Sequence, residues 1–151
     1  MDRGFSSSFA QVEKISSESS IGTTSELSHW MIQIRLVQAT AAFLKGAHLL
    51  VAADCTPVAY PGFHQIFLKD KVVLLGCPKF DDQQAYVKKS ADILRESDIK
   101  SVTVLDMEVP CCSALPVIVN KGIQITAKKI PVEEVVISTQ GHILRGREYA
   151  L

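Results

Sequence analysis

The sequence has little that would direct it to a membrane or a nucleic acid. It contains no apolar run of about 18 residues, and no apolar stretch of signal-peptide length follows Arg3. It has no excess of either charge, since Lys plus Arg and Asp plus Glu number 16 each. A balanced charge gives no general attraction to nucleic acid or to an anionic membrane. We therefore expect a cytoplasmic protein that binds neither.

The common phosphate-binding and hydrolase motifs are also absent. No GxGxxG, GxxxxGK[ST] or GxSxG occurs. The residues that usually mark a dinucleotide-binding protein, a P-loop protein or a serine hydrolase are therefore missing. Cysteine is sparse, with 4 in 151 residues, which is too few for a disulfide scaffold. In a reducing compartment these cysteines are expected to be thiols or metal ligands.

The composition divides the chain into two parts. Residues 1–28 hold 9 serines and no periodic apolar positions, which predicts a flexible Ser-rich tail or linker. Residues 29–151 are expected to form a single α/β domain, because a chain of this length supports one core.

Apolar runs alternate with helical patterns along this domain. Strands are predicted at 31–37, 48–53, 71–75, 101–105 and 132–137. Helices are predicted at 81–97 and from 112 to about 121, with one or two helical turns in 57–68. The alternation predicts a doubly wound α/β fold, with a mainly parallel sheet of four to five strands and helices on both faces.

The cysteines follow the predicted strands. Cys55 comes after the run at 48–53, Cys77 after 71–75, and Cys111 and Cys112 after 101–105. Neighbouring strands lie about 4.8 Å apart, so these loops can bring several thiolates to one metal or cluster at the carboxyl edge of the sheet. Any one of these cysteines could equally be a small apolar core residue, and no CxxC pair of the compact ferredoxin or zinc-finger type is present.

Several polar residues near the strand ends are weaker candidates. Asp54, Asp106 and Glu108 could tune the thiols, cap helices or accept hydrogen bonds from loop amides. His64 could turn toward the same edge and support the thiols, or it could be a packed side chain beside Phe63 and Phe67. Asp81 or Asp82 is expected to cap the helix that follows, as short acidic side chains commonly do. His29 and Trp30, at the start of the domain, are interpreted as structural.

Three blocks of sequence carry a resemblance to a known family. FLKGAHLLVAADC (43–55), FLKDKVVLLGCPKFDD (67–82) and DIKSVTVLDMEVPCC (98–112) closely resemble the C-terminal domain of ferredoxin-type (4Fe-4S) iron–sulfur proteins of anaerobic bacteria and archaea. The resemblance covers about residues 29–144. It implies a role near low-potential electron transfer, and the family's cysteine positions correspond to the four cysteines here.

The chain departs from that family in two respects. The N-terminal ferredoxin module with its cluster motifs is missing. The helix after the vicinal cysteines is expected to be interrupted by Pro116, Gly122 and the segment 123–129, which predicts a shortened last crossover.

Three hypotheses follow for the function. The first is a non-enzymatic accessory domain that binds an iron–sulfur cluster or zinc through Cys55, Cys77, Cys111 and Cys112 and serves electron transfer with a redox protein partner. The second is a cysteine-based thiol enzyme or redox sensor that acts through Cys111 or Cys112 at a helix amino terminus. The third is an interaction domain with inert cysteines.

Overall fold

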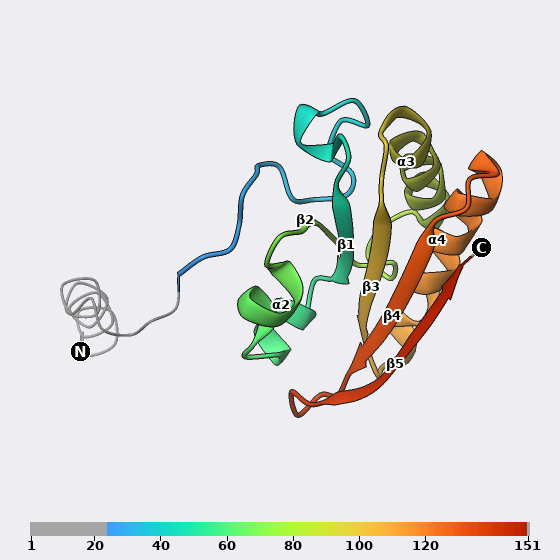
Figure 1. The fold of residues 1–151 in the computed structure, drawn as a ribbon. Coiled ribbons are helices and arrows are strands. Elements are labelled where there is room, and N and C mark those ends of the chain that lie inside the picture. Colours follow the sequence, from blue (N-terminus) through green and yellow to red (C-terminus); the bar gives the residue numbers. More distant parts are fainter. Residues whose placement is uncertain (1–23, 151) are drawn as a thin grey trace, which may run out of the picture.

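The fold is a doubly wound α/β domain built on a mostly parallel sheet (Figure 1). The computed structural model describes residues 24–150, so the predicted flexible tail at 1–28 lies mostly outside the described residues. Within this range the sheet has 5 strands in the order β2-β1-β3-β4-β5. The first four strands run parallel and β5 pairs antiparallel with β4.

The strands follow the apolar runs of the sequence. Their bounds are β1 His48–Ala53, β2 Val72–Gly76, β3 Ser101–Met107, β4 Pro131–Ile137 and β5 Ile143–Ala150. The interior positions of β1 to β4 are almost all buried, because the central strands are covered on both faces. Four of the five predicted strands are therefore confirmed.

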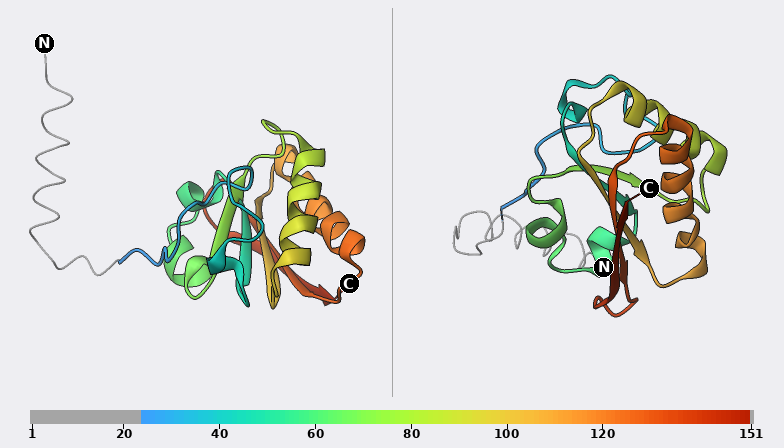
Figure 2. Two further views of the ribbon diagram at one scale, coloured as in Figure 1. Left: turned by 90° about the horizontal axis from the view of Figure 1, so that it is seen from above. Right: turned by 45° about the vertical axis from the view of Figure 1, so that its right-hand side comes forward.

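Helices cover both faces of the sheet. The long helices α3 (Gln83–Glu96) and α4 (Ala114–Thr126) lie on one side, and α2 (Thr56–Ala59) with the short helix η2 (Phe63–Leu68) lies on the other (Figure 2). Asp82 caps α3, since its carboxylate accepts the backbone N–H groups of Gln84 and Ala85. The break at 60–62 between α2 and η2 agrees with the predicted short turns.

The predicted strand at 31–37 is wrong, because this segment protects the edge of β2 instead of forming a strand. Only Gln33 makes a β-bridge, to Leu75, and the chain then turns. Leu75 donates its N–H to Ile32, and the N–H of Val73 is accepted by Nε2 of His29 at 3.0 Å. The open donors of an edge strand are thereby satisfied, which supports the structural interpretation of His29.

The other two differences concern the carboxyl-terminal part of the fold. Strand β5 was not predicted, because its sequence ILRGREYA lacks a continuous apolar run. Helix α4 continues through Gly122 to Thr126, so the predicted interruption and shortened crossover are wrong. Pro116 is tolerated since it occupies the first turn, where a backbone N–H has no helical partner.

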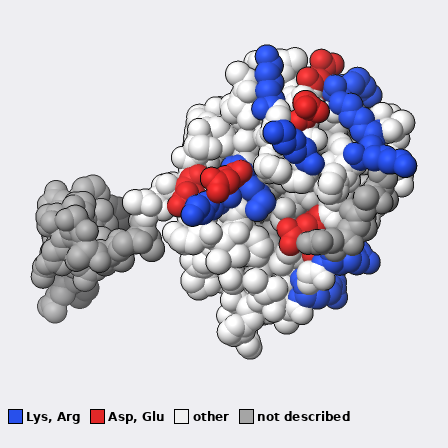
Figure 3. All heavy atoms as spheres, viewed as in Figure 1, with Lys and Arg blue, Asp and Glu red and all other residues white. Residues whose placement is uncertain are grey.

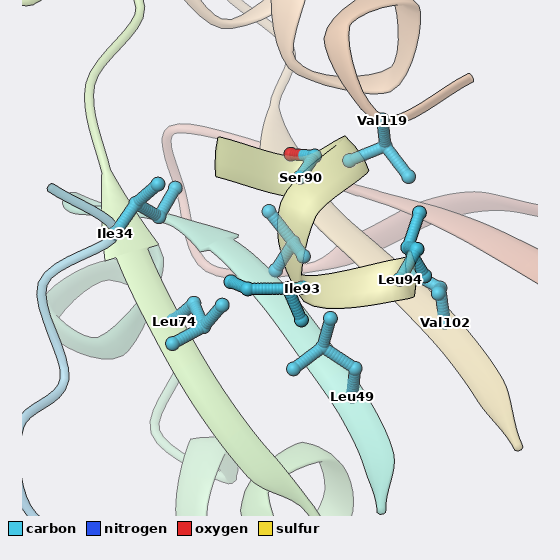
Figure 4. Close-up of a pocket in the computed structure, with 9 residues that line it drawn as sticks. Ile34, Leu49, Leu74, Ser90, Ile93, Leu94, Val102 and Val119 are labelled. Atoms are coloured by element: carbon cyan, nitrogen blue, oxygen red, sulfur yellow. The ribbon is translucent and has the colours of Figure 1, made fainter. Parts of the chain in front are cut away.

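The core between the sheet and α3 contains a small apolar cavity (Figure 4). Its volume is about 10 Å³, which is the space of a single water-sized probe. Leu49 and Val102 reach it from the sheet, and Ser90 and Ile93 from α3. A cavity of this size and lining is a packing void rather than a ligand pocket.

Candidate thiol site at the carboxyl edge

The four cysteines lie beyond the carboxyl ends of three neighbouring strands. Cys55 follows β1, Cys77 follows β2, and Cys111 and Cys112 lie in the short helix η3 (Pro110–Cys112) after β3. Because β1 lies between β2 and β3, the loops that carry the thiols are adjacent in space. The position at one edge agrees with the sequence prediction, and the role of these thiols as metal ligands remains a prediction.

The crossover pattern reverses direction between β1 and β3. The chain passes from β1 outward to β2 and then returns across the sheet to β3. In doubly wound sheets the crevice at such a switch point, outside the carboxyl ends of the strands, is where ligands bind. Cys55 and Cys111 flank this crevice, which makes it the candidate functional site.

The thiols differ in how far solvent can reach them. Cys55 and Cys111 are exposed and Cys77 is half-buried, whereas Cys112 is only 3% exposed and belongs to the hydrophobic core. Burial raises the pKa of the Cys112 thiol to about 11, and the neighbouring Cys111 and Asp106 act in the same direction. Cys112 therefore resists ionisation, and the thiols that solvent reaches at this edge are those of the other three cysteines.

The loop of Cys77 is fixed by a tyrosine of α3. The phenol oxygen of Tyr86 accepts the backbone N–H of Cys77 at 3.2 Å, and the phenol shares a hydrogen bond with Asp81. Asp81 in turn accepts a hydrogen bond from Arg35 at 2.6 Å. Burial and the nearby Asp81 raise the pKa of Tyr86 to about 12, so the phenol keeps its proton.

Gly76 makes room for this tyrosine. A Cβ at Gly76 would lie 2.5 Å from the Tyr86 hydroxyl oxygen and 2.8 Å from Cδ1 of Ile34. Gly76 ends β2 in the regular parallel register with Ala53. Glycine is required here by the close approach of a neighbouring side chain.

Asp106, near the end of β3, is a buried carboxyl group with an unsatisfied oxygen. It is 4% exposed, and among the described residues its Oδ1 is the one buried side-chain oxygen or nitrogen without a hydrogen-bond partner. Burial raises its pKa to about 7; Glu134 adds to this effect and Arg145 opposes it. The sequence indicated Asp106 only as one of several acidic residues near strand ends, because a single Asp in an apolar strand carries no motif that predicts its burial.

A hollow of about 130 Å³ lies over β4 and β5, and Val136, which lines it, is the register partner of Asp106 in β3. Glu134, Val136, Arg145 and Arg147 line this hollow. Arg147 binds Glu134 at 2.7 Å, so the charges of the two residues largely offset each other.

Asp54, Glu108 and His64, which were predicted as possible support for the thiols, lie in different surroundings. Asp54 directly follows β1 at the edge, and desolvation together with Asp81 raises the pKa of its carboxyl group. Glu108 follows β3 and is exposed. His64 is engaged elsewhere, because its Nδ1 accepts the N–H of Glu26 at 3.1 Å.

The donor atoms fit a thiophilic metal in kind, but one chain does not bring them together. Within residues 24–150, no three Cys, His, Asp or Glu side chains are gathered closely enough to hold a metal ion.

In the same part of the chain, none of the helices has both the length and the apolar character needed to cross a membrane.

Fold and site define a doubly wound α/β domain with accessible thiols at its switch point. Residues 41–151 match the family model of a Rossmann-like domain, and the chain belongs to this family. An uncharacterized protein of Archaeoglobus fulgidus is 34% identical over 118 residues, which cover 78% of this chain and 83% of that relative. No solved structure matches the chain.

Proposed function

We propose that the chain is an accessory domain of a ferredoxin-type redox protein, which binds an iron–sulfur cluster or zinc at the carboxyl edge and serves electron transfer. The observation that supports this proposal is the arrangement of Cys55, Cys77 and Cys111. These three solvent-reachable thiols follow three adjacent parallel strands around the switch point. Thiolate is the ligand that zinc and iron–sulfur clusters share.

Anaerobic purification or reconstitution, followed by visible absorption and metal analysis, tests the proposal. A cluster gives broad brown absorbance with iron and sulfide, and zinc gives bound metal without colour. Protein that takes up neither, under conditions that load a known iron–sulfur protein, would contradict the proposal. If the thiols of such a protein also fail to react with an alkylating reagent, the third hypothesis, an interaction domain with inert cysteines, would remain.

A second candidate function is a redox pair formed by Cys111 and Cys112. It is favoured by the adjacency of the two cysteines in η3, where Cys111 contributes to the raised pKa of Cys112. Their oxidation would form one S–S bond, release two protons and pass two electrons to a disulfide or peroxide oxidant. Exposed Cys111 would attack, because the pKa of Cys112 is raised. A two-thiol loss after mild oxidation of metal-free protein would support this candidate.

A further inference from the structure

A row of three side chains crosses the last strands of the sheet. Asp106 of β3 is the register partner of Val136 in β4, and Val136 pairs in turn with Arg145 of β5. Register partners project to the same face of a sheet, so these side chains stand next to one another. The face is the one that carries α3 and α4, because Val102, four residues before Asp106, reaches the core cavity against α3.

The neighbouring row contributes an ion pair. Glu134 of β4 is the register partner of Arg147 in β5, and their side chains meet at 2.7 Å. Together with Val136 and Arg145 they line the hollow of about 130 Å³ over β4 and β5. Glu134 and Val136 are buried, whereas both arginines are exposed. The hollow therefore has a buried floor and an outer wall of long, flexible arginine side chains.

The charged residues of the β4–β5 hairpin lie along its strands and not at its tip. No Asp, Glu, Lys or Arg occurs in 135–144, and Figure 3 shows acidic and basic side chains together over the middle of β4 and β5 on the face turned to the viewer. The hollow belongs to the opposite face, the one that carries α4. Glu133 alternates with Glu134 along β4, so its side chain projects away from the hollow.

Two groups of the first row have no opposite charge to bind. Oδ1 of Asp106 is buried without a hydrogen-bond partner among the described residues. Arg145 makes no ion pair with any side chain that the structure describes. The two do not pair with each other, because two strand spacings separate their Cα atoms by about 10 Å. Arg145 nevertheless opposes the rise in the pKa of Asp106, which indicates that its charge acts on this carboxyl group.

We propose that this hollow binds a small α-amino acid, whose ammonium group donates to Asp106 and whose carboxylate accepts from Arg145. Charge-assisted hydrogen bonds of about 2.8 Å at both ends of such a ligand would bridge the gap across Val136. Val136 offers an apolar surface to a small side chain. The inference goes beyond the proposed function, since none of the residues that line the hollow is a cysteine.

The test titrates isotope-labelled full-length protein with glycine, L-alanine and L-serine and follows the backbone amide NMR signals of β3, β4 and β5. Propionate and ethylamine are the control ligands, because each carries only one of the two charged groups. We expect an amino acid to bind, and both control ligands to bind roughly tenfold more weakly or not at all. Propionate that binds as tightly as the amino acids would reveal a plain anion site at the arginines and overturn the proposal.

Two substitutions each remove one partner of the ligand. Asp106→Asn and Arg145→Gln are both expected to weaken amino-acid binding by roughly tenfold or more. Glu133→Gln is the control, because it removes a charge from the same strand on the opposite face, where Glu133 accepts a hydrogen bond from Thr103 at 3.3 Å. This variant should bind as the wild type does. Equal weakening in all three variants, or none in the first two, would overturn the proposal.

The remaining outcomes are also decisive. Denaturant unfolding identifies a variant that fails to fold, and Arg145→Gln alters an exposed side chain, so it keeps the test valid if Asp106→Asn is unstable. If none of the three amino acids binds, the proposal is wrong and Asp106 is satisfied by water alone. The metal test of the proposed function does not involve these residues, so either proposal can fail without the other.

Discussion

The phenol oxygen of Tyr86 accepts the backbone N–H of Cys77 at 3.2 Å, and this bond ties the first turn of α3 to the loop that carries a candidate ligand. Through Asp81 the same phenol is linked to Arg35 in the segment that protects the edge of β2. The direction of the Cys77 loop therefore depends on residues from three parts of the chain.

Replacing Tyr86 by Phe is expected to loosen this loop. The variant loses the acceptor for the Cys77 N–H and the donor to Asp81, which should lower the free energy of unfolding by about 1–2 kcal/mol. Alkylation of Cys77, followed by mass spectrometry, should become faster. Tyr60→Phe is the control, because the Tyr60 ring packs edge-on against Phe67 and should keep that contact. Equal alkylation rates in wild type and Tyr86→Phe would contradict the positioning role.

Gly122 allows α3 and α4 to approach closely. A Cβ at this position would lie 2.8 Å from Cβ of Ser90 and 3.2 Å from the backbone nitrogen of Ala91. Helix propensity alone would make Gly122→Ala stabilising by up to about 1 kcal/mol. We expect the overlap to dominate and the substitution to destabilise the domain by roughly 1–2 kcal/mol in denaturant unfolding.

Gly146→Ala in β5 is the control for that substitution. The nearest atom to its added Cβ is 3.9 Å away, which is an ordinary contact. Its stability should match the wild type within about 0.5 kcal/mol. If Gly122→Ala proves as stable as this control, the close helix contact is not what fixes glycine at 122.

The sequence predicted the parts of the fold in which apolar runs and helical periodicity coincide with buried elements. β1, β2, β3 and β4 are such runs, and α3 carries the predicted Asp82 cap. The segment 31–37 shows the limit of this reasoning, since Ile34 and Val37 are buried as expected but lie on a turn. An apolar run reports burial and does not by itself report backbone conformation.

The candidate site was predicted in position but not in detail. That the cysteines lie at strand ends could be read from their spacing, because parallel strands end at a common edge. The burial of Cys112 and the isolation of Asp106 arise from packing between segments distant in sequence. No local pattern encodes such packing, so these two features required the structure.

Asp106 is expected to make stability fall as pH rises from about 4 to about 7. Its pKa is raised from 3.8 to about 7 in the folded domain, so over this window the unfolded chain gives up a proton that the folded chain retains. The loss should level off above the folded pKa. Glu134, Arg145 and Cys112 are the charged or titratable groups that act on it or respond to it.

Asp106→Asn should remove this contribution. His29 acts in the opposite direction, because burial lowers its pKa and protonation at low pH destabilises the fold. The quantity to measure is therefore the difference in unfolding free energy between wild type and Asp106→Asn at each pH. A difference that stays constant across the window would show that Asp106 does not titrate there.

Replacing Cys77 is expected to damage metal binding more than replacing Cys112. Cys77 is half-buried at the edge in a loop held by Tyr86, so its thiol has a defined direction and no neighbouring cysteine in sequence to take its place. Cys112 lies in the core and has a raised pKa, and exposed Cys111 stands beside it. Cys77→Ser should therefore abolish metal uptake, whereas Cys112→Ser should leave a weakened site.

The stability of the two variants should follow the opposite order. A serine hydroxyl at position 112 would be buried where the thiol packs as a small apolar group, which should cost about 1–3 kcal/mol in unfolding. At the half-exposed position 77 the change should cost less than about 1 kcal/mol. Metal content, alkylation rate and the free energy of unfolding, measured on both variants, separate the metal-binding hypothesis from the thiol-pair hypothesis. Metal binding that is kept in Cys77→Ser but lost in Cys112→Ser would reverse the assigned roles. A loss of oxidant-dependent reactivity in Cys112→Ser alone would favour the vicinal thiol pair.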